Sequence, residues 1–196
     1  MRTGRLEAFS DGVLAILITI MVLELKVPTG PTFDDLRPSL VGLLTYLLSF
    51  VYIGIYWNNH HHMFRLVRHV SGAILWANLA LLFMLSLVPF TTAWMDDTRF
   101  ARLPVVVYGV NLLAAAVAYY VLQLAVFRRD GSDGLLRQAL GRDLKGKLSP
   151  VVYVLGILGS VAAPWIGVLA YVAVAITWLV PDRRAERLIH DHALED

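Results

Sequence analysis

The chain has no cysteine among its 196 residues, which excludes disulfide bonds, thiolate metal ligands and cysteine nucleophiles. Charge is also scarce, because Asp, Glu, Lys and Arg together make up 16% of the sequence, against about 25% in ordinary soluble domains. Glycine-rich phosphate loops, Ser/His/Asp sets and the His-Glu-x-x-His pattern are missing as well. The sequence is therefore predicted not to be an enzyme and to need neither a cofactor nor a structural metal.

Apolar residues are abundant instead. Hydrophobic types make up 58% of the chain, and the mean hydropathy is +0.64. A chain of this size cannot hide so much apolar surface inside one water-soluble core. It is predicted to be an all-α membrane protein, surrounded by lipid. The pI near 9.0 accompanies a net charge of only +2, which membrane topology explains without a nucleic-acid partner.

Five apolar blocks are long enough to suggest membrane helices. They are Gly12–Leu23, Leu40–Trp57, Val70–Met95, Leu103–Phe127 and Val151–Val180. The last block would be about 45 Å long as a single helix, more than a bilayer core of about 30 Å requires. With a cytoplasmic N-terminus, 13 basic residues lie inside the cell if the tail is inside too. This requires six crossings, with an outer turn at Ala162–Ile166 and both termini cytoplasmic.

The predicted architecture is one six-span domain over residues 1–196. Its spans are about 6–27, 38–62, 70–95, 103–127, 149–163 and 165–180, with a cytoplasmic loop 128–148 and a tail 181–196. The first span is expected to be permanent rather than a cleaved signal peptide. Pro89 is expected to kink or end the third span. Within residues 128–150, apolar residues at helical spacing indicate either a helix on the cytoplasmic leaflet or a solvated basic linker. They are Leu135, Leu136, Ala139, Leu140 and Leu144.

The first span carries unusual chemistry. A helix from about Leu6 to Val27, ended by Pro28, places Asp11 inside the bilayer, where ionisable residues are functional by default. Arg5 lies about 240° around the helix from Asp11, so a partner from another helix is expected. The alternative is that Ser10 or Asp11 merely caps a shorter helix.

Beyond Asp11 this span is apolar on every face, so periodicity alone identifies no pore-lining side. Ile16, Ile20 and Leu23 follow one another at one-turn spacing, with Thr19 beside them as the only interior hydroxyl. Judged from the residues alone, a lipid-facing or packing role is the better interpretation.

Polar residues also occur in the later spans. Three consecutive histidines, His60 to His62, point about 100° apart and cannot converge on one metal ion. They indicate a pH-sensing or hydrogen-bonding cluster, or an interfacial belt with Trp57. Asn78 lies at a similar depth, so it is expected to form one buried polar layer with Ser10 and Asp11. Asn111 and Gln123 are typical of close helix packing and receive no chemical role.

Four sequence motifs in order resemble the transmembrane protein 175 family of potassium channels. They are Arg5–Val13 with its Phe-Ser-Asp, Trp57-x-x-His60-His61-x-x-Phe64, Trp76-x-Asn78-Leu79 and Leu87-Val88-Pro89-Phe90-x-Thr92. The resemblance covers about the first half of the chain. It implies a bacterial single-repeat member that forms a homotetramer in the plasma membrane, with the first helix of each copy lining a central pore.

The resemblance also assigns roles to residues. It implies a potassium-selective leak channel whose apolar constriction is formed by Ile16, Ile20 and Leu23, with Thr19 contributing to selectivity. A polar network would hold the pore helices, and its members are Arg5, Ser10, Asp11, Trp57, His60 and Asn78. Two rival functions stay open. One is a proton- or cation-coupled transporter that uses Asp11 or the His60–His62 cluster, and the other is an assembly subunit without conduction.

Overall fold

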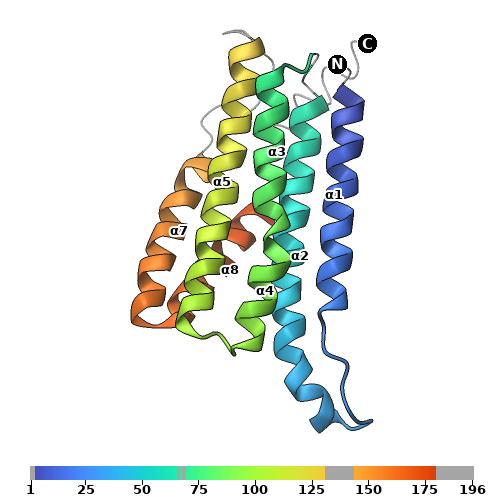
Figure 1. Cartoon of the computed structure of the whole chain (residues 1–196). Helices are drawn as coiled ribbons and strands as arrows, with labels where there is room; N and C mark the ends of the chain where they lie inside the picture. The colour runs from blue at the N-terminus through green and yellow to red at the C-terminus, as the bar shows by residue number, and fades with distance from the viewer. Residues whose placement is uncertain (1–2, 66, 68, 131–143, 180–196) are drawn as a thin grey trace.

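The computed structural model describes residues 3–65, 67, 69–130 and 144–179, and the only regular secondary structure in this part of the chain is α-helix (Figure 1). The helices are α1 (Thr3–Leu23), α2 (Phe33–Arg65), α3 (Gly72–Ser86), α4 (Val88–Asp97), α5 (Arg102–Asp130), α7 (Leu144–Ala162) and α8 (Pro164–Leu179). Helices α3 and α4 continue one another across a kink, so the fold is a six-span bundle. The predicted all-α membrane fold is confirmed.

Four segments are long and apolar enough to cross a membrane: α1, α2, the α3–α4 rod and Arg102–Arg128 of α5. Helix α8 is a shorter apolar helix and forms a hairpin with α7. The turn between them is closed by two backbone hydrogen bonds, from the amide of Ala163 to the carbonyl of Gly159 and from Ile166 to Ala163. The predicted division of the last apolar block into two helices is confirmed.

Several helix ends differ from the prediction. Helix α1 begins at Thr3 and ends at Leu23, not at Val27, because the chain after it is held outside the helix. The Ser39 hydroxyl donates to the Lys26 carbonyl, 3.1 Å away. Residues 128–130 and 144–148, predicted as loop, belong to α5 and α7. The proposed leaflet helix at Leu135–Leu140 and the tail 181–196 lie outside the described residues.

Large apolar side chains lie exposed on every helix of the bundle. Examples are Leu44 on α2, Trp76 on α3, Phe90 on α4 and Leu169 on α8. Water would make such a surface aggregate, whereas lipid accepts it. The exposed surface thus agrees with the apolar composition in indicating a bilayer as the surrounding medium.

The core on the α7–α8 side is built around buried tyrosines. Tyr52 of α2 donates its hydroxyl to the carbonyl of Tyr171 on α8 over 2.6 Å. Tyr108 of α5 reaches the Ser49 hydroxyl of α2 at 3.0 Å. Gly109 permits the close approach of α8, since a Cβ at this position would overlap the Tyr171 hydroxyl. Hydrogen-bonded rings therefore fix α8 against α2 and α5.

The kink between α3 and α4 is completed by a side chain from α5. Pro89 has no amide hydrogen, and the helical ladder opens just before it. The Asn111 side-chain amide is oriented so that both its nitrogen and its oxygen have hydrogen-bond partners. The nitrogen then donates to the Met84 carbonyl over 2.9 Å, and the oxygen accepts from the Val88 amide over 3.3 Å. These two backbone groups are a helical i, i+4 pair. Asn111 thus replaces the missing helical bond, and the predicted kink at Pro89 is confirmed.

An ion pair holds the linker after α1 to the end of α4. Lys26 Nζ lies 2.5 Å from Asp97 Oδ1, and both side chains are largely exposed. The hydrogen bond and the charge of Asp97 raise the pKa of Lys26 above its ordinary value of 10.5. A raised pKa means that this pair stabilises the fold below that ordinary value, and that the stabilisation disappears as the pH rises through the raised value.

We expect Lys26→Met to lower the melting temperature slightly at neutral pH, because exposed ion pairs contribute little. The gap between parent and variant should close as the pH rises from about 8 to about 12. Thermal unfolding of the purified protein across this range measures it, with Arg37→Met as the control for loss of an exposed cation. A gap that widens with pH would contradict the assignment.

Candidate functional site

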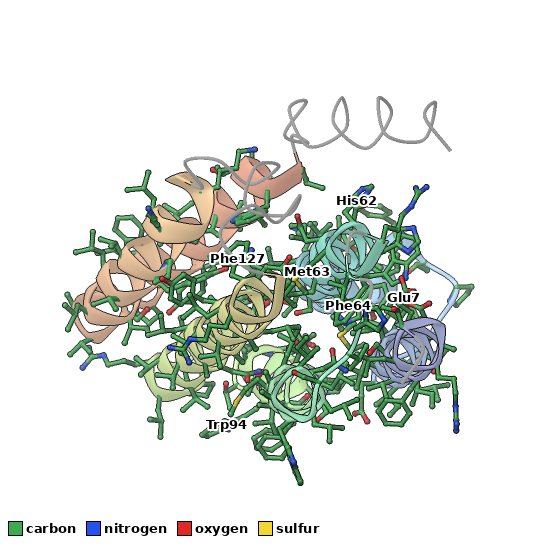
Figure 2. The ribbon with its side chains drawn as sticks, turned by 90° about the horizontal axis from the view of Figure 1, so that it is seen from above. Glu7, His62, Met63, Phe64, Trp94 and Phe127 are labelled. Atoms are coloured by element: carbon green, nitrogen blue, oxygen red, sulfur yellow. The ribbon has the colours of Figure 1, made fainter. Side chains whose placement is uncertain are left out.

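Helix α1 stands at the edge of the bundle and packs on one side only (Figures 1 and 2). It is the least buried of the four long apolar segments. Its buried residues recur at helical spacing along one stripe: Leu6, Ser10, Leu14, Leu17 and Met21. Most of the rest of its surface is exposed in the part of the subunit that the structure describes.

The residues predicted for the constriction share this unpartnered side. Ile16, Ile20 and Leu23 are 58%, 41% and 81% exposed. Thr19 lies exposed beside them, and its hydroxyl donates to the Ile16 carbonyl over 2.8 Å. The Thr19 oxygen consequently keeps its lone pairs free to face outward. One helix face therefore presents three aliphatic side chains and one acceptor oxygen.

Three predicted network residues meet in a buried chain between α1, α3 and α2. The Asn78 amide donates to Ser10 Oγ over 3.0 Å, and its carbonyl oxygen lies 2.8 Å from His60 Nε2. Since that oxygen can only accept, His60 carries its proton on Nε2. All three residues are at most 2% exposed. The Ser10 hydroxyl in turn donates a hydrogen bond to the Leu6 carbonyl over 2.9 Å, which ends the chain.

A second, exposed set of contacts joins α1 to α2. The Trp57 indole donates to Asp11 Oδ1 over 3.0 Å. Glu7 faces His61, with 3.7 Å between Oε1 and Nδ1. Figure 2 shows Glu7 on α1 directed toward the end of α2. The predicted partner of Asp11 from another helix is thus present.

One expectation about this helix is wrong, and the alternative of a shorter helix capped by Ser10 or Asp11 is excluded. Asp11 is exposed at the subunit surface and does not join the buried layer of Ser10, Asn78 and His60. Its carboxylate avoids burial because the helix turns it outward, past Trp57. Ser10 and Asp11 also do not cap the helix, because α1 begins seven residues earlier, at Thr3.

Arg5 is exposed, and it makes no hydrogen bond or ion pair with the described residues. One subunit alone does not bring it into the network, so its role there stays a prediction. A contact that was not predicted from the sequence anchors the helix close to Arg5. Thr3 donates its hydroxyl to the carbonyl of Val67 over 3.0 Å, which ties the start of α1 to the segment after α2. No sequence pattern marks that contact.

The described residues contain no group of three or more His, Asp or Glu side chains arranged to hold a metal ion. The site is therefore made of an apolar outer face and of hydrogen bonds that fasten the inner face. Such an arrangement can narrow or widen a passage, and it offers no apparatus for bond chemistry.

Comparison with known proteins identifies relatives along the whole chain. The family described as endosomal/lysosomal potassium channel TMEM175 matches residues 5–89. A potassium channel of Chryseobacterium sp. (strain P1-3) is 50% identical over 98% of this chain and 100% of its own length. Human TMEM175, named an endosomal/lysosomal proton channel, is 31% identical over 51% of this chain and 22% of its own length.

A solved structure agrees with these sequence matches. The crystal structure of a lysosomal potassium-selective channel TMEM175 homologue from Chamaesiphon minutus is similar with a TM-score of 0.73 and 33% identity. The similarity covers 90% of this chain and 96% of that one. On the strength of the full-length relative and this shared fold, the chain belongs to the TMEM175 family.

Proposed function

We propose that four copies of the chain form a potassium-selective leak channel, with α1 of each copy lining a central pore. The observation that carries this proposal is the division of α1 into a fastened face and an unpartnered face that holds Ile16, Ile20 and Leu23. Bacterial relatives named potassium channels and the potassium-selective homologue from Chamaesiphon minutus support the choice of ion.

The constriction follows from the spacing of these side chains. Ile16 and Ile20 are about 6 Å apart along the helix axis, and Leu23 lies about 4.5 Å further. In four copies around one axis, these side chains would form three successive levels, each made of four aliphatic side chains that surround the pore. A narrow apolar ring sheds water and thereby blocks ions until it widens, which is gating by dewetting. Residues Gly12 and Ala15 on the same side are small, which lets neighbouring copies approach.

The polar network would set how firmly α1 is held. Inter-helix hydrogen bonds in bilayers average only about 0.6 kcal/mol, so α1 is fastened by several weak bonds. The Asn78 chain acts at the buried face, and the Trp57–Asp11 contact acts at the rim. This combination allows α1 to shift as a unit while its register against α2 and α3 is kept.

The charges at the two ends of the bundle support a membrane orientation. Basic residues gather at the end where α1 begins: Arg5, Arg65, Arg128, Lys145 and Lys147. The opposite end has four basic residues and five carboxylates: Lys26, Arg37, Arg99 and Arg102 with Glu24, Asp34, Asp35, Asp96 and Asp97. The excess of positive charge favours a cytoplasmic N-terminus in a bacterial plasma membrane. The end of α8 is then cytoplasmic as well, because the six spans alternate in direction.

Liposomes that contain the purified protein test the proposal directly. A channel gives passive unitary currents and a potassium reversal potential. A transporter that uses Asp11 or the His60–His62 cluster gives saturable, coupled flux that Asp11→Asn uncouples. Tight vesicles without flux would indicate a subunit without conduction. Crosslinking of the reconstituted protein should stop at the tetramer.

Thr19→Val tests the selectivity element, because valine keeps the shape of threonine and removes the oxygen. We expect a few-fold loss of potassium selectivity over sodium with currents retained, since an oxygen ligand next to the constriction is lost. Reversal potentials in mixed potassium and sodium gradients measure this ratio. The matched control is Thr177→Val, because Thr177 of α8 is also exposed and also donates to its own helix. Unchanged selectivity in Thr19→Val would remove Thr19 from the mechanism.

A further inference from the structure

A cavity lies between α2, α5, α7 and α8, on the side of α2 away from α1. It has a volume of about 50 Å³, and its wall includes Tyr56, Asn59, Ala116, Gln123, Ser149 and Trp178. These residues lie near the helix ends that gather where α1 begins. One water needs roughly 10–15 Å³ by this measure, so the space holds roughly three to five waters or one small ring.

The wall is aromatic and uncharged. Tyrosine rings from α2, α5 and α7 and the Trp178 indole of α8 supply most of it, and none of the described residues that line it is Asp, Glu, Lys or Arg. Aromatic walls favour a flat apolar body in offset or edge-on contact. These described side chains offer no counter-charge to an ion, whereas they do offer amide and hydroxyl groups to an uncharged molecule.

Some polar groups of the wall already have partners. The Trp178 indole donates to Ser149 Oγ over 2.8 Å, and Ser149 donates to the Lys145 carbonyl over 2.7 Å. Asn59 donates to the Ile55 carbonyl over 2.8 Å. These bonds lock the wall in place, so the cavity is held open by the fold.

Two polar groups of the wall have no hydrogen-bond partner among the described residues. The Gln123 side chain belongs to a residue that is only 4% exposed, and it makes no hydrogen bond with the described residues. The Tyr56 hydroxyl likewise has no bonded partner among them, although its residue is 9% exposed. The residues are buried, yet their polar atoms are open to the cavity that they line. The Gln123 amide and the Tyr56 hydroxyl are therefore available to hydrogen-bond a molecule inside it.

We propose that this cavity binds a small uncharged molecule that has a ring and one hydroxyl or amide group. The ring fills the aromatic wall, and its polar group exchanges hydrogen bonds with the Gln123 amide and the Tyr56 hydroxyl. Such a molecule partitions into a membrane and reaches the bundle from the lipid. The site is separate from the α1 face and does not depend on conduction.

The probe is 4-fluorophenol, observed by ¹⁹F NMR on the purified protein, with empty micelles as the blank. Fluorobenzene serves as the partner of nearly the same size without a hydroxyl. We expect saturable broadening of 4-fluorophenol by the parent protein. Gln123→Met should weaken 4-fluorophenol binding about tenfold and leave fluorobenzene binding unchanged or stronger, because only the hydroxyl loses its partner.

Ala116→Leu fills the cavity and should abolish binding of both probes. The matched control is Val117→Leu, because Val117 is the next residue of α5 and is 50% exposed outside the cavity wall. Binding that survives Ala116→Leu, equal affinity in the parent and Gln123→Met, or no binding at all would overturn the proposal. The last result would show that the cavity holds water only. Should Ala116→Leu fail to fold, the Gln123→Met comparison decides.

Discussion

An Ile16→Asn channel should conduct about tenfold or more faster than the parent at the same density in liposomes. Ile16 is the first of the three aliphatic residues on the unpartnered face of α1. Four asparagine side chains around the pore hydrogen-bond water, so the constriction stays hydrated. It then loses the barrier to ions that four apolar side chains impose. A barrier lower by about 1.4 kcal/mol already gives that tenfold increase. Potassium flux into vesicles measures it.

The matched control is Ile176→Asn. Ile176 of α8 is 58% exposed, the same fraction as Ile16, and it belongs to a different span from the proposed pore helix. It loses the same aliphatic branch and gains the same amide, so it reports any general effect of a polar residue in lipid. Equal flux in the two variants, or a flux through Ile16→Asn no higher than the parent, would remove α1 from the pore.

Asn78→Leu should lower the free energy of unfolding by about 2 kcal/mol and release α1 from the bundle. Two terms can be compared. The two lost hydrogen bonds amount to about 0.6 kcal/mol each in a bilayer, whereas a buried donor without a partner costs about 1–3 kcal/mol. The second term dominates, because the leucine leaves the buried Nε2 hydrogen of His60 without an acceptor.

The measurement is reversible unfolding of the purified protein in mixed detergent, with crosslinking between α1 and α3 as a report on helix position. Asn58→Leu is the control, since Asn58 on α2 is exposed and makes no contact of this kind. If Asn78→Leu unfolds like Asn58→Leu, the buried chain holds nothing together and the proposed fastening of α1 fails.

Much of the fold could be predicted from the sequence. Apolar run length and the distribution of basic residues required six spans, and Pro89 predicted the break between α3 and α4. Helix ends were less predictable. The end of α1 at Leu23 depends on contacts of the following linker with Ser39 and Asp97, which are distant in sequence.

The sequence allowed us to predict which residues belong to the candidate site better than how they are arranged in space. Similar depth in the bilayer brought Ser10 and Asn78 together in the prediction, and the structure pairs them directly. The outward orientation of Asp11 could not be predicted, because it depends on the rotation of α1 against α2. The exposed face of Ile16 and Ile20 was equally hidden, since every side of that helix is apolar. The roles of these residues stay predictions.

The amide of Asn111 at the α3–α4 kink has a mechanical consequence. A proline kink whose unpaired backbone groups are free can act as a hinge. Here the Met84 carbonyl and the Val88 amide are both hydrogen-bonded by Asn111 of the neighbouring helix α5. Bending at Pro89 would have to break bonds to α5 or drag that helix along. The third span and α5 are therefore coupled as one rigid unit. Under the proposed function, we expect the movements of opening and closing to concentrate in α1.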